Sequence, residues 1–85
     1  SRGLGDVYKR QDYNKAKNTL ANIEKPDAYT DYLMAVLGAR TNNQSMLTSS
    51  LKNAVAKDSS LAKKAATDLE FAKYFTNSDF MNIIK

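Results

Sequence analysis

Two pairs of acidic residues come closest to a spacing that could support chemistry. Asp27 and Asp31 are four residues apart, so one helical turn would present both carboxylates together, as acid–base chemistry requires. At the first turn of a helix, two acids are explained more simply by N-capping and by attraction to the positive end of the helix dipole. Asp68 and Glu70 are two residues apart and would point away from each other on a helix. Neither pair predicts an active site.

The residue types that usually complete a catalytic or metal site are missing from this chain of 85 residues. It has no histidine and no cysteine, which removes the usual general base, the commonest metal ligand and any thiolate or disulfide site. Serine and threonine hydroxyls lack that base; a serine–lysine dyad is compatible with the composition, but no feature supports one. Outside residues 1–11, no glycine-rich loop could hold a phosphate. We therefore expect a non-enzymatic protein without metal or cofactor.

Residues 1–11 do not continue any pattern found later in the chain. Residues 6–11 read, codon for codon, as GAT GTG TAT AAG AGA CAG, and residues 1–5 as TCT CGT GGG CTC GGA. This resembles a translated transposon-end sequencing adaptor, that is, a non-native N-terminal segment. The alternative is a flexible basic N-terminal arm. The adaptor interpretation implies that the natural chain is truncated and that its reading frame starts near Asp12.

The adaptor interpretation lowers the net charge that can be used to predict function, because residues 1–11 are then left out. Two of the four net positive charges lie in residues 1–11, which leaves +2 for residues 12–85, with ten basic and eight acidic side chains. The pI of about 9.4 therefore overstates the case for nucleic acid or an anionic membrane. The basic doublet Lys63-Lys64 is typical of a solvated helix face. No apolar run is long enough to span a bilayer.

Apolar side chains recur every three or four residues, which predicts an all-α fold with short turns. A first helix from Asp12 would end at Pro26, because the residue before a proline is pushed out of the helical conformation. Asp27 would cap a second helix that ends near Arg40, and a third would begin at Ser45. The apolar stripes are Tyr13, Ala16, Leu20 and Ile23; then Tyr29, Leu33, Val36 and Leu37; then Leu47, Leu51, Ala54 and Val55.

The C-terminal part predicts shorter helices. Asp58-Ser59-Ser60 interrupts the third helix and offers a new N-cap. A fourth helix then either continues or bends around Thr67-Asp68, and Asn77-Ser78 breaks it before a last short helix. The apolar residues of these segments are Leu69, Phe71, Ala72, Tyr74, Phe75, Phe80, Ile83 and Ile84.

A weak internal repeat points to a family. Residues 13–27 and 44–58 align at an offset of 31, close to the length of a two-helix solenoid repeat. Residues 12–16, Asp-Tyr-Asn-Lys-Ala, resemble the opening of the second helix in tetratricopeptide repeats, and residues 51–58 resemble the ending of that helix. The resemblance covers residues 12–60 and implies a short array of helical hairpins, an α-solenoid: the second helix of one unit and one complete unit.

Several positions depart from the pattern of the family. Asp31 stands where the family usually has a bulky residue, and Ser59 replaces its proline. Gly38 takes the place of a packing tyrosine, and Leu47 that of the alanine that lets the two helices approach closely. The complete unit is therefore degenerate.

The resemblance implies where a partner would bind. In such arrays the first helices line a concave groove and the second helices form the convex back. The groove positions of the family correspond here to Tyr29, Tyr32, Val36, Ala39 and Arg40. Tyrosine and arginine are enriched at binding hot spots. The alternative is that Tyr29 and Val36 pack against a preceding unit.

Residues 61–85 would form a C-terminal helical cap. Phe71, Tyr74, Phe75 and Phe80 are four of the eight aromatic residues, and the last repeat of a solenoid exposes an apolar face unless something covers it. The alternative is an aromatic platform for a ligand. Residues 68–75 also resemble the tail of some Gram-negative cell-envelope proteins with such repeats, which would imply the bacterial periplasm or cell envelope.

These observations predict a module that binds a protein or peptide partner at the C-terminal end of a tetratricopeptide-like scaffold. The main alternative is a structural capping segment without a ligand of its own, and weak nucleic-acid binding comes third. The truncated N-terminal side would leave an apolar stripe uncovered, which allows self-association.

Overall fold

The computed structural model describes residues 10–85, with the backbone alone for residues 10 and 11. Residues 1–9, which carry most of the adaptor interpretation, lie outside the described residues. The described chain is helical and contains no strand, which confirms the all-α class. Its elements are α2 (Arg10–Ala21), α3 (Ala28–Arg40), α4 (Gln44–Lys57), α5 (Ser60–Thr67), the 3₁₀-helix η1 (Leu69–Tyr74) and α6 (Ser78–Ile84).

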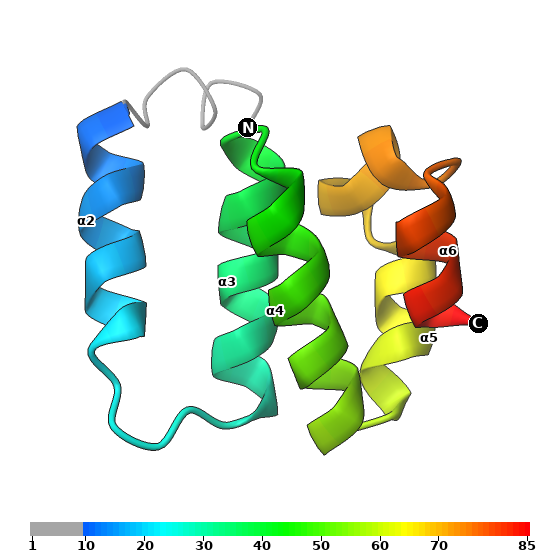
Figure 1. Ribbon diagram of the computed structural model, residues 1–85, viewed down its shortest axis with the longest axis horizontal. Coiled ribbons are helices and arrows are strands. Elements are labelled where there is room, and N and C mark those ends of the chain that lie inside the picture. The colour runs from blue at the N-terminus through cyan, green and yellow to red at the C-terminus, as the bar shows by residue number, and fades with distance from the viewer. Residues whose placement is uncertain (1–9) are drawn as a thin grey trace.

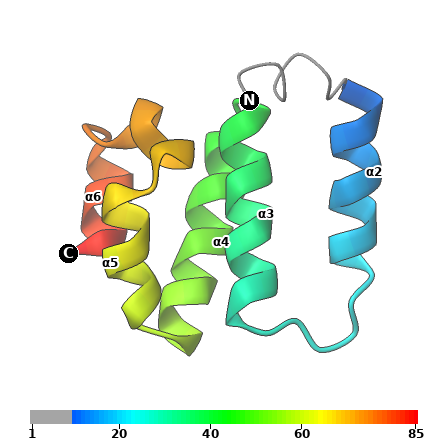
Figure 2. The same ribbon diagram turned by 180° about the vertical axis from the view of Figure 1, so that it is seen from behind.

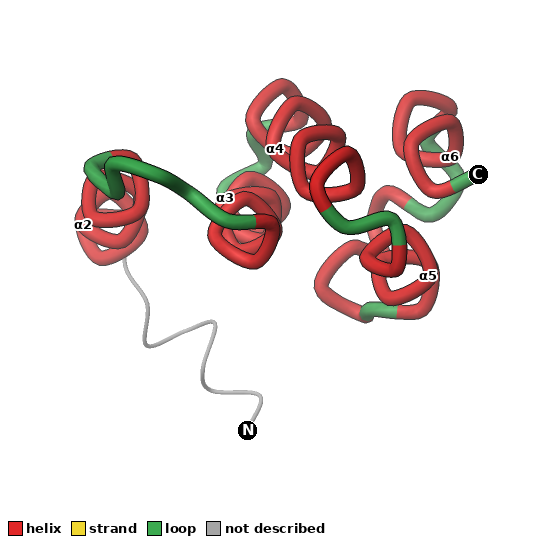
Figure 3. The backbone as a smooth tube through the Cα atoms, turned by 90° about the horizontal axis from the view of Figure 1, so that it is seen from below, coloured by secondary structure: helices red, strands yellow, loops and turns green. Residues whose placement is uncertain are grey.

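The helices are arranged around a central antiparallel pair. Figure 1 shows α3 and α4 in the middle, α2 beside α3 on one side, and α5, η1 and α6 on the other, and the view from behind agrees (Figure 2). Seen from below, α3 and α5 lie in one row and α4 and α6 in a second (Figure 3). None of the helices in the described range is long and apolar enough to cross a membrane.

Asparagine and aspartate side chains start the helices that follow α2. Asp27 accepts hydrogen bonds from the Thr30 amide at 2.7 Å and the Thr30 hydroxyl at 2.8 Å, which lowers the pKa of Asp27 below its ordinary value. This confirms the expected cap of the second helix. The other side chains that accept an amide at a helix start are Asn43 for α4, Asp58 for α5, Asp68 for η1 and Asn77 for α6.

Two helices approach closely where the sequence has glycine. A Cβ atom on Gly38 would lie 2.6 Å from the Leu47 amide nitrogen and 2.9 Å from its Cα. The absence of a side chain at Gly38 therefore brings α3 against the backbone of α4. Asn42, in the turn between these helices, takes the left-handed conformation with φ of 58°, which asparagine tolerates better than most residues.

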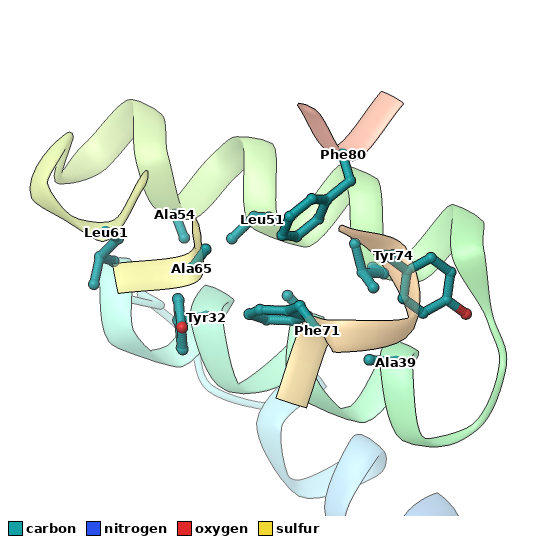
Figure 4. Close-up of a cluster of buried hydrophobic side chains, with 11 residues drawn as sticks. Tyr32, Ala39, Leu51, Ala54, Leu61, Ala65, Phe71, Tyr74 and Phe80 are labelled. Atoms are coloured by element: carbon teal, nitrogen blue, oxygen red, sulfur yellow. The ribbon is translucent and has the colours of Figure 1, made fainter. Parts of the chain in front are cut away.

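The core lies between α3, α4 and the C-terminal helices. Phe71 packs between Tyr32 and Phe80, with ring centroids 5.5 Å and 5.6 Å away (Figure 4). Leu47 and Leu51 of α4 are fully buried beside them. The buried hydrophobic residues are Tyr32, Ala35, Ala39, Leu47, Leu51, Ala54, Leu61, Ala65, Phe71, Tyr74 and Phe80.

Two sequence expectations about helix bounds need correction. The first helix ends at Ala21 rather than near Pro26, and Ile23, placed in its stripe, is 39% exposed. The chain uses residues 22–27 to turn back toward α3, and the Pro26 carbonyl accepts a hydrogen bond from Lys57 of α4 at 2.8 Å. The third helix begins at Gln44, one residue before the expected Ser45.

After Thr67 the chain bends at Asp68, one of the two expected alternatives, and continues as a 3₁₀-helix. Residues three apart share a face of a 3₁₀-helix. Phe71 and Tyr74 are therefore buried together, whereas Leu69 and Ala72 lie on another face and Leu69 is 81% exposed. Leu69 is not a core residue.

Candidate functional site

A groove lies between α2 and α3 and extends to the start of η1. It encloses about 690 Å³, and four of the five expected partner-binding residues line it: Tyr29, Tyr32, Val36 and Arg40. Ala39 is not among the lining residues and is 7% exposed. It lies in the core, so a direct role in binding a partner is wrong for this residue.

The apolar wall of the groove comes from matching faces of the two helices. Tyr29, Leu33, Val36 and Leu37 recur along α3 with helical spacing, and we call them the outer face of α3. Leu33, Val36 and Leu37 are half-buried, and Tyr29 is 57% exposed. The opposite wall is the stripe of α2, formed by Tyr13, Ala16 and Leu20, which are also half-buried.

Tyr32 belongs to the core more than to the groove surface. Its side chain is 2% exposed, and its hydroxyl donates a hydrogen bond of 2.6 Å to Asp68 Oδ2. Burial first, and this hydrogen bond second, raise the pKa of Tyr32. Lys64 Nζ lies 5.6 Å from the ring centroid, within reach of a cation–π interaction. Tyr32 therefore joins α3 to the C-terminal segment, and its burial favours a structural role for this residue.

Arg40 closes one end of the groove through a paired contact. Its guanidinium donates to both carboxylate oxygens of Glu70, with Nε–Oε1 at 2.9 Å and Nη2–Oε2 at 2.5 Å. The hydrogen bond with Glu70 is the main reason that the pKa of Arg40 is raised, and Tyr13 of α2 contributes to the same shift. Bidentate pairing fixes the guanidinium plane and neutralises its charge. Arg40 thus shapes the groove and links it to η1.

The acidic pairs found in the sequence have structural partners. Asp27 caps α3, and Asp31 Oδ2 lies 2.7 Å from Lys57 Nζ, which ties α3 to the end of α4. Asp68 accepts the Tyr32 hydroxyl, and Glu70 pairs with Arg40. Within the described residues, no group of three or more potential ligands could hold a metal ion. Capping explains Asp27, as expected, and ion pairing explains Asp31.

The C-terminal aromatic residues form part of the core. Phe71 and Phe80 have no exposed surface, and Phe75 lies 6.0 Å from Phe80 between ring centroids. Tyr74 is 9% exposed. Phe71, Tyr74 and Phe80 are too deeply buried for a ligand to stack on them, and the half-buried Phe75 packs against the same core, so the four rings do not form an aromatic platform.

Several residues of the groove were not expected from the sequence. Leu33 and Leu37 were assigned to an apolar stripe but not to the site, although their spacing from Tyr29 carried that signal. Asp68 and Glu70 are 36 and 30 residues away from their partners Tyr32 and Arg40. No local pattern indicates such distant pairs.

The site thus consists of an apolar groove between α2 and α3 with the paired charges of Arg40 and Glu70 at its edge. Comparisons with protein-family models, with curated proteins and with solved structures find no match.

Proposed function

We propose that this chain is a non-enzymatic interaction module that binds a segment of a partner protein, or a peptide, in the groove between α2 and α3. In this proposal it forms the C-terminal part of a tetratricopeptide-like scaffold. The two rows of helices in Figure 3 support such an array, because α3 and α5 take the place of first helices and α4 and α6 that of second helices.

The two departures at Gly38 and Leu47 also support this relationship. The family has a large residue in the first helix and a small one in the second, and this chain has the reverse. A Cβ on Gly38 would meet the Leu47 backbone at 2.6 Å, so the glycine supplies the close approach that the alanine supplies in the family. The side chain of Leu47 is fully buried at the same place. Reversing the sizes of these two residues keeps α3 and α4 close and the space between them filled.

The observation that carries the binding proposal is Tyr29 at the edge of an apolar groove. Its side chain is 57% exposed and is stacked with Tyr32, with ring centroids 6.4 Å apart and planes at 5°. An exposed tyrosine held by a buried neighbour is a preorganised contact surface, because few rotamers remain to be fixed on binding. Ligand sites are typically concave and apolar with a few polar groups, as this groove is.

A structural role is the second candidate, and specific contacts favour it. Tyr32 and Ala39 are buried, and Arg40 is paired with Glu70, so three of the five expected binding residues contribute to the fold. A capping segment without a ligand needs no more than this. Nucleic-acid binding has less support, because Arg40 and Lys57 are paired with acids.

Selection of peptides tests the binding proposal. A phage-displayed library of random peptides would be selected on the full chain, and the affinities of the selected peptides measured by fluorescence anisotropy. We expect Tyr29→Ala to weaken their binding tenfold or more, since a hot-spot residue contributes about 1.4 kcal/mol or above. Lys52→Ala is the matched control, because Lys52 is exposed on α4 and does not line the groove.

The outcomes separate the three functions. If no peptide is selected, or if Tyr29→Ala leaves the affinities unchanged, the groove is not the binding site and the structural role is favoured. Binding of a single-stranded DNA probe that falls steeply with salt would favour the nucleic-acid function instead.

A further inference from the structure

The core of the molecule is complete without α2. All eleven buried hydrophobic residues belong to α3, α4, α5, η1 and α6. In α2, none of the described side chains, residues 12–21, is buried, and only the stripe of Tyr13, Ala16 and Leu20 is half-buried. A helix attached by one half-buried stripe can detach without opening the core.

The connection between α2 and α3 is suited to such a movement. Residues 22–27 are all exposed. The start of α3 is fixed independently of α2, because Asp27 caps it and Lys57 binds the Pro26 carbonyl. Asn22 and Ile23 still donate backbone hydrogen bonds to carbonyls of α2, so the segment free to change direction is residues 24 and 25. Segments that connect a separable element are where exchange between molecules takes place.

We propose that two copies of this chain exchange α2, so that α2 of one molecule packs on the outer face of α3 of the other. The proposal rests on the proposed function, because it takes the α2 wall of the same groove from a second copy. Reciprocal exchange forms a symmetric dimer in which each contact between α2 and α3 is kept, so little beyond the entropy of association opposes it.

The structure itself identifies the occupant. The outer face of α3 is already covered by an amphipathic helix, α2, which faces it with an aromatic, a small and an aliphatic residue at spacings of three and four: Tyr13, Ala16 and Leu20. Tyr13 adds a polar contact, since it acts on the guanidinium of Arg40 at the end of the groove. A second copy carries this complementary surface without any change of sequence.

Single cysteines can detect the exchange directly, because the chain has none of its own. Ala16 and Val36 line the groove from opposite sides. Chains with Ala16→Cys alone would be mixed with mass-tagged chains with Val36→Cys alone, refolded together at increasing concentrations, and treated with a short bis-maleimide. We expect a cross-linked heterodimer that increases with concentration. Asn18→Cys is the matched control on the exposed side of α2, and we expect it to cross-link several-fold less.

A second variant shortens the connection between α2 and α3, which favours exchange of α2 over packing within one chain. Deletion of residues 22–25 shortens the connection from six residues to two, Pro26 and Asp27, which is the lower limit for helices that pack beside each other in one chain. We expect this variant to be mainly dimeric by light scattering and to retain the helix content of the full chain by circular dichroism. A monomeric variant with reduced helix content would overturn the proposal.

Two further outcomes would also overturn it. One is a cross-link that forms only within the double variant Ala16→Cys/Val36→Cys at every concentration, and the other is a dimer that cross-links equally through Asn18→Cys. Peptides that bind the groove of a strictly monomeric chain would leave the proposed function standing and remove the exchange. A cross-linked heterodimer without any selected peptide would support the exchange and argue against peptide binding in the groove.

Discussion

Gly38 and Tyr32 show how single residues set the geometry around the groove. Gly38 allows α3 to contact the backbone of α4, where a Cβ would lie 2.6 Å from the Leu47 nitrogen. Tyr32 joins α3 to η1 through its ring and its hydroxyl. Both residues lie on α3, opposite or beside its outer face. The position of the outer face of α3 therefore depends on contacts inside the protein, with α4 and η1.

At Gly38 we expect substitution by alanine to destabilise the protein by about 1–3 kcal/mol, because backbone atoms of α4 cannot move aside as a flexible side chain would. In an ordinary helix the same change stabilises by about 1 kcal/mol, so the sign distinguishes the two situations. Urea denaturation followed by circular dichroism measures it. Ser49→Ala, at an exposed position of α4, is the control. A Gly38→Ala variant as stable as the wild type would show that the helices are further apart.

At Tyr32 we expect a pH dependence, because its pKa is raised above the ordinary value of 10.0. The unfolded chain loses the phenol proton near pH 10, whereas the folded chain retains it. This contribution to stability is therefore complete below pH 10 and is lost as the pH rises above it. Thermal melts from pH 8 to 11 should show a smaller decrease in Tm for Tyr32→Phe than for the wild type. Parallel decreases would mean that other groups cause the effect.

Among the elements, α3 and α4 follow from local sequence and η1 does not. The apolar periodicity and Asp27 predict where α3 starts, because capping is a local interaction. Asn43 and Asn77 cap α4 and α6 in the same way, although the sequence indicated only a turn and a helix break there. The change from α-helix to 3₁₀-helix after Asp68 depends on packing of Phe71 against Tyr32, far away in the sequence. The groove residues were predicted in part for the same reason: periodicity identifies a face but not the distant residues that cover it.

The register of α4 has its own test. Leu51 has no exposed surface, and Lys52, its neighbour, is exposed. We expect Leu51→Ala to lower the free energy of unfolding by about 2–4 kcal/mol, because a cavity is left in a small core. Lys52→Ala should change it by less than about 0.5 kcal/mol. Chemical denaturation of both variants compares them, and equal effects would show that the register of the helix is wrong.

The attachment of α2 can be measured by hydrogen exchange. Its side chains from 12 to 21 are exposed or half-buried, whereas Phe71 and Tyr74 of η1 are buried. We expect the amides of α2 to be the least protected among the helices and to gain protection as protein concentration rises, because exchange between copies retains docked α2. If the amides of α2 were the most protected ones in a dilute monomer, its weak attachment would be refuted.

For the whole molecule, the distribution of contacts divides the described chain into two unequal parts. Residues from Ala28 onward share one core, and α2 is joined to it along a single stripe and through an exposed connection. Tyr32–Asp68 and Arg40–Glu70 hold the larger part together across 36 and 30 residues of sequence. We expect these links to hold the outer face of α3 in place whether or not α2 covers it.

The exposed connection between α2 and α3 is also a site where proteases can cleave the chain. The chain has two glutamates, Glu24 in this connection and Glu70 in its pair with Arg40. A glutamate-specific protease should therefore cut first after Glu24, since nicking favours exposed segments without packed side chains. Trypsin should spare the neighbouring bond, because Lys25 precedes Pro26. Mass spectrometry of a short digest would then show a stable fragment of residues 25–85, from which α2 has been removed and in which the outer face of α3 is uncovered.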